Sequence, residues 1–219
     1  MQKFRMVFAA FLALVLAGLS SAQVTPTKKG YLILIRYKKG QVLKYNIDMK
    51  LLGTTNSSSV QIVTKCLDVD KKGISTLEVS TPYGNKTNSR KLKVDRHGKP
   101  VGQVIDGFSG NFMWPETPIK IGQTWNGDFN LGADNPGAGM LKATYKLAAI
   151  KVVGGTKVAV VTTVIDYKGE YQVSGTGTIN VRVSDGQLND ATFNVRMDQY
   201  TDSSKTGVMK LLMTIRTKS

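Results

Sequence analysis

The chain has 219 residues, of which 41% are hydrophobic, enough for one β domain or two small lobes around a substantial core. It carries 30 lysines and arginines against 15 acidic residues, a formal net charge of +15, and the lysines are spread along the chain. A single cysteine and a single histidine exclude an internal disulfide and the usual zinc sites.

The first 22 residues have the three parts of a secretory signal peptide. Lys3 and Arg5 supply a positive start, residues 6–19 form an apolar run, and the residues up to Ala22 are small. We expect cleavage after Ala22, because the apolar run is shorter than the roughly 20 residues that a membrane-spanning helix needs. The sequence predicts a secreted or periplasmic protein with no transmembrane segment in the mature chain, which would keep a net charge of +13 after losing two cations.

The rest of the chain has the pattern of successive β-strands. Residues 43–51 and 209–216 alternate between apolar and polar side chains, the period of a strand with one buried and one wet face. Further runs rich in Val, Ile, Thr and Tyr cover residues 31–37, 60–69, 74–79, 91–95, 141–153, 157–167, 170–184 and 191–198. Short turns such as Asp185-Gly186 favour antiparallel neighbours.

A weak internal repeat divides these strands into two sets. The sequence KKGQ at residues 38–41 opens one strand, and KIGQ at residues 120–123 opens another about 82 positions later. Matching segments around Cys66 and Leu147 keep nearly the same offset. Duplication explains the ordered offsets, and chance similarity between two β meanders is the alternative.

Residues 114–125, WPETPIKIGQTW, form the predicted joint between the two sets. Its two prolines hold the chain extended, and its Gly-Gln pair makes the turn into the next strand. Trp125 matches the core-facing Leu43 of the first set, so we expect it to be buried. Trp114 has no such counterpart and is expected to be the freer of the two.

These patterns together predict the fold class. We expect an all-β protein with a large curved antiparallel sheet or open barrel built from two tandem meander repeats. The signal peptide covers residues 1–22, the first meander 23–113 and the second 114–219, and the two meanders form one compact domain. The concave face of such a sheet must be filled by its own side chains or by an apolar guest.

The joint resembles a motif that recurs in exported bacterial β-rich proteins of uncharacterised function. The motif, P-x-K-x-G-[QD]-x-W, is carried here by Pro118, Lys120, Gly122, Gln123 and Trp125. The resemblance covers this motif and the surrounding meander. It implies an exported bacterial protein with a large curved sheet, and it supplies no reaction and no catalytic residues. The expected architecture is also remotely similar to the periplasmic lipoprotein carriers, whose curved sheet holds acyl chains; this is an analogy of fold.

Residue types that commonly serve catalysis are few, and their settings are those of structural residues. His97 stands in a predicted turn, where the flanking Asp95 and Gly98 serve the backbone, and Cys66 is expected to be a buried, inert thiol. Asp68 and Asp70 lie next to lysines and have the pattern of wet-face charges. We therefore expect no catalytic residue, no metal site and no cofactor, although a pair of carboxylates far apart in sequence stays open.

Glycines mark two further places. Gly175 and Gly177 lie in a strand-like run that no helix follows, so we expect them to permit a bulge or a bend rather than to bind phosphate. The glycine-rich residues 132–139 are the predicted mobile lip of the sheet.

The sequence favours a non-enzymatic binding protein of the cell envelope. In the first hypothesis the concave face holds a lipid or another apolar ligand, and self-filling by the core is the alternative. In the second, a structural or adhesion protein binds anionic envelope polymers through a basic face, with no specific nucleic acid. A hydrolase with unidentified carboxylates is the third. The candidate ligand-binding residues are Tyr45, Ile47, Trp114, Trp125 and Phe129. The lysines expected on the wet face are Lys44, Lys50, Lys91, Lys93, Lys99, Lys142, Lys146 and Lys210.

Overall fold

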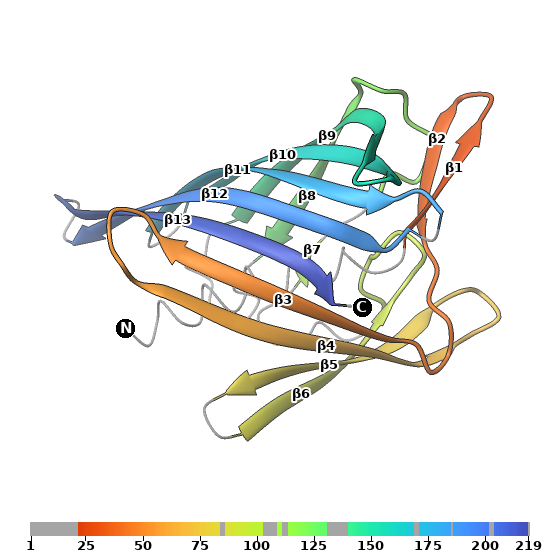
Figure 1. Ribbon diagram of the computed structural model, residues 1–219, viewed down its shortest axis with the longest axis horizontal. Helices are drawn as coiled ribbons and strands as arrows, with labels where there is room; N and C mark the ends of the chain where they lie inside the picture. Colours follow the sequence, from red (N-terminus) through yellow and green to blue (C-terminus); the bar gives the residue numbers. More distant parts are fainter. Residues whose placement is uncertain are drawn as a thin grey trace.

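The computed structural model shows an all-β protein, as the alternation of side chains predicts (Figure 1). It describes residues 22–83, 86–102, 109–110, 114–130, 140–168, 171–184, 186–201 and 204–218. Within these ranges no helix is long and apolar enough to cross a membrane. The expected signal peptide, apart from Ala22, and the expected lip at residues 132–139 lie outside the described residues.

The described strands form two antiparallel sheets. The small sheet pairs β1 (Ala22–Thr27) with β2 (Gly30–Ile35). The large sheet has 11 strands in the order β6-β5-β4-β3-β13-β12-β11-β10-β9-β8-β7. Its strands are β3 (Val42–Leu51), β4 (Ser57–Val69), β5 (Ser75–Tyr83), β6 (Lys86–Val94), β7 (Ser109–Gly110), β8 (Thr124–Asn130), β9 (Met140–Val153), β10 (Thr156–Lys168), β11 (Tyr171–Arg182), β12 (Leu188–Thr201) and β13 (Ser204–Lys218).

The large sheet consists of two meanders that meet in its middle. Strands β3 to β6 neighbour one another in chain order, and so do β7 to β13. The meanders join where β13 pairs with β3, with Ile215 opposite Ile47. Among the described residues the edge strands β6 and β7 do not pair with each other, so the curved sheet stays open. In Figure 1 strands β3, β12 and β13 lie at the front, while β7 and β8 lie at the back.

Alternation along each strand gives the large sheet a buried inner face and a polar outer face. On β3, Tyr45 and Ile47 are 1% and 0% exposed, whereas Lys44 and Asp48 on the other face are exposed. Buried residues from both meanders and the β1–β2 hairpin form one hydrophobic core. Complete burial of one aliphatic side chain contributes about 1.5–3 kcal/mol, so this core stabilises the fold. The lysines expected on the wet face are all exposed.

The β1–β2 hairpin closes one end of the curved sheet. Ile35 N donates to Arg96 O at 2.6 Å, and Tyr31 N donates to Ile119 O at 2.7 Å. The hairpin is thereby bonded both to the last turn of the first meander and to the joint. Gly30 permits this approach, because a Cβ there would lie 2.4 Å from Ile119 O.

Gly177 makes room for an aromatic ring, and neither Gly175 nor Gly177 lies at a bulge of the β11–β12 pairing. The pairing of β11 with β12 passes through both glycines without a shift, and the bulge lies between Asn180 and Val181. A Cβ on Gly177 would lie 2.3 Å from Cδ1 of Phe193, its partner across the strands. The expectation of a bulge at these glycines is therefore wrong. A side chain at position 177 would collide with Phe193 on the neighbouring strand, and the sequence alone does not reveal that pairing.

Candidate functional site

The two tryptophans of the joint contact each other in the core. Their ring centroids lie 6.3 Å apart at an angle of 46°, and Trp125 stacks on Tyr145 at 5.5 Å and 23°. Trp114 is only 1% exposed, while Trp125 is half-buried, which is the reverse of the expected order. Trp114 N donates to His97 O at 3.0 Å, so the backbone holds this residue inside. Burial also raises the pKa of Tyr145 well above its ordinary value.

The other candidate residues lie on strands far apart in the sheet order. Tyr45 and Ile47 are on the inner face of β3, in the same core as Trp114. Phe129 lies on β8 opposite Leu141, and its side chain is outside the described part. The structure thus brings Trp114 and Trp125 into direct contact, and it places Tyr45 and Ile47 elsewhere in the shared core.

Tyr45 is a buried phenol on the inner face of β3. Burial is the main cause that raises the pKa of Tyr45 well above its ordinary value, with a smaller contribution from Tyr37, while nearby Arg182 opposes the shift. Tyr45 therefore stays protonated at neutral pH. The sequence did not single out Arg182, because its approach to Tyr45 depends on the pairing of β13 with β3.

The inner face is fully buried towards the closed end and loosens at the opposite end. Met213 and Ile215 on β13 are 0% exposed, whereas Met209 and Leu211 on the same face are half-buried. The half-buried side chains of this region, called the methionine end below, are Met49, Leu51, Met197, Met209 and Leu211.

Strand pairing holds the methionine end together. Met197 faces Met209 between β12 and β13, and Leu211 faces Leu51 between β13 and β3. On the next strand the inner-face position opposite Met49 is Ser58, which is exposed, so solvent reaches this end of the inner face. Methionine side chains are flexible and polarizable, and they adapt to apolar ligands of varied shape.

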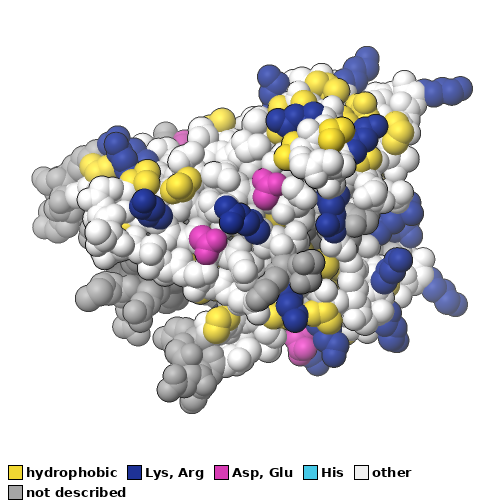
Figure 2. All heavy atoms as spheres, in the orientation of Figure 1, with side chains coloured by type: hydrophobic (Ala, Val, Ile, Leu, Met, Phe, Trp, Pro, Cys, Tyr) yellow, Lys and Arg dark blue, Asp and Glu magenta, His cyan; other side chains and the backbone are white. Residues whose placement is uncertain are grey.

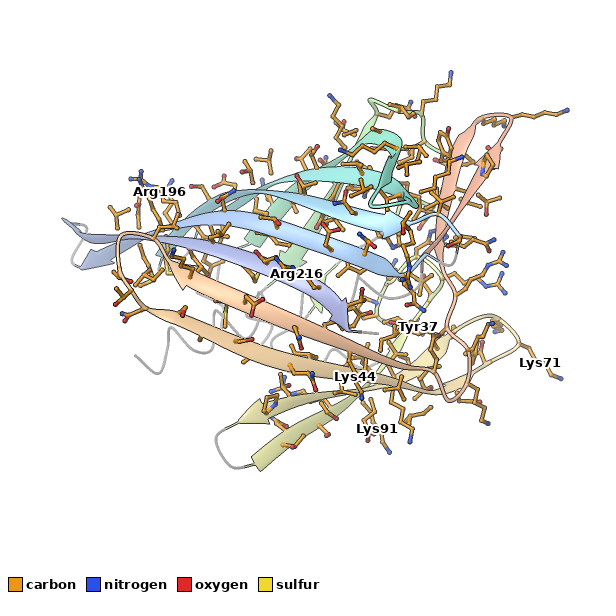
Figure 3. The ribbon with its side chains drawn as sticks, viewed as in Figure 1. Tyr37, Lys44, Lys71, Lys91, Arg196 and Arg216 are labelled. Atoms are coloured by element: carbon orange, nitrogen blue, oxygen red, sulfur yellow. The ribbon has the colours of Figure 1, made fainter. Side chains whose placement is uncertain are left out.

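A polar groove of about 840 Å³ crosses the ends of β3, β13, β12 and β11. Its charged lining is Lys44, Arg182, Arg216 and Asp190, with amide and hydroxyl side chains between them. The Asp190 carboxylate accepts hydrogen bonds from Asn180 Nδ2 at 2.7 Å and Asn189 Nδ2 at 2.6 Å. Figure 3 shows Arg216 and Lys44 on neighbouring strands of this face. Three cations and one carboxylate leave the lining of the groove with a net positive charge.

Carboxylates in the described turns serve the backbone. Asp95 Oδ1 accepts hydrogen bonds from the amides of His97 and Lys99, both at 2.8 Å. Asp70 Oδ1 makes the same pair of bonds, to the amides of Lys72 and Ile74. His97 thus stands where Lys72 stands in a matching turn, and the turn needs no imidazole there.

The remaining groups with catalytic potential are dispersed. Cys66 is 1% exposed, and burial raises the pKa of its thiol. Asp68 is exposed and pairs with Lys39 at 3.1 Å. Among the described residues, no three His, Cys, Asp or Glu side chains gather where they could hold a metal ion.

No family model matches the chain, and no curated protein matches it. The likeness of the joint to the motif of exported β-rich proteins therefore stays a prediction. The hypotheses about function depend on the geometry of the inner face, the polar groove and the two ends of the sheet.

Proposed function

We propose that the protein is an exported, non-enzymatic binding protein of the cell envelope, which holds an apolar chain on the inner face of its sheet. The observation that carries the proposal is the loosening of the inner face at the methionine end. A core filled throughout by the protein would bury Leu211 as completely as Met213 on the same strand and face. The half-buried side chains there offer apolar area that a guest would cover.

The size of the guest follows from the free energy of burial. Each buried methylene contributes about 0.8 kcal/mol, so ten of them contribute about 8 kcal/mol. Association costs roughly 4–15 kcal/mol in lost freedom of motion. A guest must therefore carry a chain of at least about this length, as lipids do. Met197 and Leu211 are its first contacts, whereas Tyr45 and Ile47 are already covered by protein.

Mass spectrometry under native conditions tests the proposal. The protein is purified gently from its own host, and an acyl-containing molecule is expected to accompany it. Fluorescence of Trp125, which lies at the closed end, is expected to stay unchanged on addition of fatty acid. Absence of a co-purified molecule contradicts the proposal and favours a self-filled core.

Two adjacent leucines provide a matched pair of variants. Leu211 lies on the inner face and Leu212 on the outer face of the same strand, and both are half-buried. Leu211→Gln is expected to lower the amount of bound acyl chain at least tenfold, because a buried amide without a partner opposes an apolar guest. Leu212→Gln is expected to leave binding unchanged. Equal losses in the two variants would point to general destabilisation instead.

The polar groove supports a second candidate function, the binding of an anionic envelope polymer. Lys44, Arg182 and Arg216 supply positive charge along one groove. The double variant Lys44→Gln/Arg216→Gln is expected to weaken binding of an anionic polysaccharide such as heparin, with Lys91→Gln/Lys93→Gln as the exposed control. If the control weakens binding as much, the groove is not the site.

A further inference from the structure

Six turns of the large sheet project at the end that the β1–β2 hairpin covers. Because neighbouring strands are antiparallel, the turns around Gly40, Gly73, Gly98, Gly122 and Gly186 lie at this end, together with the Gly154-Gly155 turn. Lysines and arginines crowd this end in Figure 2, whereas the face of β12 and β13 in the same view bears few. The exposed cations here are Lys28, Lys29, Arg36, Lys38, Lys39, Lys71, Lys72, Arg96, Lys99, Lys120, Lys151 and Lys157.

Four described carboxylates at this end offset part of that charge. Asp70 and Asp95 are bonded to the amides of their own turns, and Asp68 pairs with Lys39 at 3.1 Å. Glu116 is exposed in the joint. Among the described residues, the 12 cations named above outnumber these four carboxylates three to one, whereas the whole chain has 30 cations to 15 acidic residues.

Two large aliphatic side chains stand among these cations. Ile121 is 51% exposed in the turn before β8, and Val152 is 67% exposed near the tip of the β9–β10 hairpin. Each is flanked in sequence by a lysine, Lys120 and Lys151. The tips can be called the docking tips; their residues are Lys28, Lys29, Lys120, Ile121, Lys151, Val152 and Lys157.

We infer that the docking tips bind the surface of a lipid bilayer that contains anionic lipids. The lysines meet the phosphate headgroups, and each one near an anionic surface strengthens attachment several-fold. Ile121 and Val152 enter the boundary between headgroups and acyl chains, where apolar area leaves water. A soluble anionic polymer would bind the lysines but would offer no apolar phase to the aliphatic side chains. The presence of exposed lysines beside exposed aliphatic side chains therefore favours a bilayer.

This attachment is independent of the apolar guest proposed above. The docking tips and the methionine end lie at opposite ends of the sheet, because β13 runs from one to the other. A docked protein would thus hold the methionine end away from the bilayer, and any guest would be exchanged on the side facing the solvent.

Co-sedimentation with vesicles tests the inference. The full chain is expressed in its host, and the purified protein is mixed with two kinds of vesicle. One kind is pure phosphatidylcholine, and the other contains about one third phosphatidylglycerol. Binding is expected to the anionic vesicles only, and to weaken as salt rises from about 0.1 to 0.5 M, since the Debye length falls with salt. Binding to both vesicle types alike would overturn the charge contribution.

Matched variants separate the tips from the rest of the basic surface. Lys28→Gln/Lys29→Gln/Lys120→Gln/Lys151→Gln is expected to lower vesicle binding at least tenfold, and Lys91→Gln/Lys93→Gln/Lys142→Gln/Lys210→Gln less than twofold. Both variants lose the same charge from exposed positions. Equal losses would overturn the assignment to the tips.

A second pair of variants tests the aliphatic contact. Ile121→Ser/Val152→Ser is expected to lower binding at least fivefold, whereas Val164→Ser/Val208→Ser, exposed at 58% and 49% on β10 and β13, is expected to leave it unchanged. If the tip variant binds anionic vesicles as well as the unaltered protein does, the aliphatic side chains make no contact with the bilayer. The partner is then an anionic polymer that the lysines alone recognise, and the inference is wrong.

Discussion

Gln41 and Gln123 make the same hydrogen bonds in the two meanders. The side-chain Oε1 of each accepts from a lysine amide three residues earlier, Lys38 N at 3.0 Å and Lys120 N at 2.6 Å. Their backbone oxygens accept from Cys66 N and Leu147 N, at 2.8 and 3.1 Å. Two hairpins that arose by duplication would keep such a shared turn. The shared hydrogen bonds agree with duplication, which stays a hypothesis.

Replacing these glutamines should weaken the turns by similar amounts. Gln41→Ala and Gln123→Ala each remove one acceptor for a lysine amide, and each is expected to lower the free energy of unfolding by about 1 kcal/mol. Urea unfolding followed by fluorescence measures the change. Gln123→Glu keeps an acceptor oxygen and is expected to retain most of the stability. A loss in the glutamate variant as large as in the alanine variant would mean that this hydrogen bond contributes little.

Gly177 and Gly207 should respond in opposite ways to the same substitution. A Cβ on Gly177 would lie within 3.0 Å of Phe193 and Thr163, and both neighbours are buried. Gly177→Ala is therefore expected to destabilise the protein by about 1–3 kcal/mol. Nothing lies within 4 Å of a Cβ on Gly207, so Gly207→Ala is expected to be neutral or stabilising by about 0.4–1 kcal/mol. Thermal unfolding of both variants gives the comparison, and an unchanged Gly177→Ala would show that the sheet shifts easily here.

Much of the fold was predictable because strand periodicity is local. The alternation over residues 43–51 places Tyr45 and Ile47 on the buried face, and the structure confirms an all-β fold with a large curved antiparallel sheet. The pairing of β13 with β3 was not predictable, since it joins residues far apart in sequence. That pairing brings Arg182 near Tyr45 and aligns Leu51 with Leu211 at the methionine end.

Burial of the tryptophans shows the same limit. Trp125 was expected to be the more buried because of its match with Leu43, but the burial of a residue in a sheet also depends on the neighbouring strands and loops. Trp114 is held inside by a hydrogen bond to His97, a contact between the joint and a turn of the first meander. No periodicity of side chains within the joint predicts this contact between Trp114 and His97.

The two tryptophans should therefore differ in stability effect and in solvent access. Trp114→Phe is expected to cost about 1–2 kcal/mol, because it leaves a gap in the core, and Trp125→Phe less than half of that. Each variant also leaves a single tryptophan. Acrylamide is expected to quench Trp125 in the Trp114→Phe protein more strongly than Trp114 in the Trp125→Phe protein. The reverse order of quenching would contradict the burial described here.

Stability should fall in alkali through the buried tyrosines. The folded pKa values of Tyr45 and Tyr145 lie above the unfolded value of about 10. Their stabilising effect is thus fully present below about pH 10 and is lost as the pH rises from there towards the folded pKa values, by up to about 1.4 kcal/mol per pH unit for each. Urea unfolding at about pH 9 and pH 11 should show a smaller loss in Tyr45→Phe/Tyr145→Phe than in the unaltered protein. Equal losses would indicate that other groups dominate alkaline unfolding.

The methionine end should reveal itself by its rate of oxidation. Hydrogen peroxide converts a methionine to its sulfoxide at a rate that follows solvent access to the sulfur. Met49, Met197 and Met209 are half-buried, whereas Met213 is 0% exposed on the same inner face. Brief treatment followed by peptide mass spectrometry is expected to oxidise the first three several-fold faster than Met213. Added fatty acid should slow the first three and leave Met213 unaffected, because a guest covers only the loosened end. Equal rates at all four positions would show that the inner face opens along its whole length, and the location proposed for the guest would then be wrong.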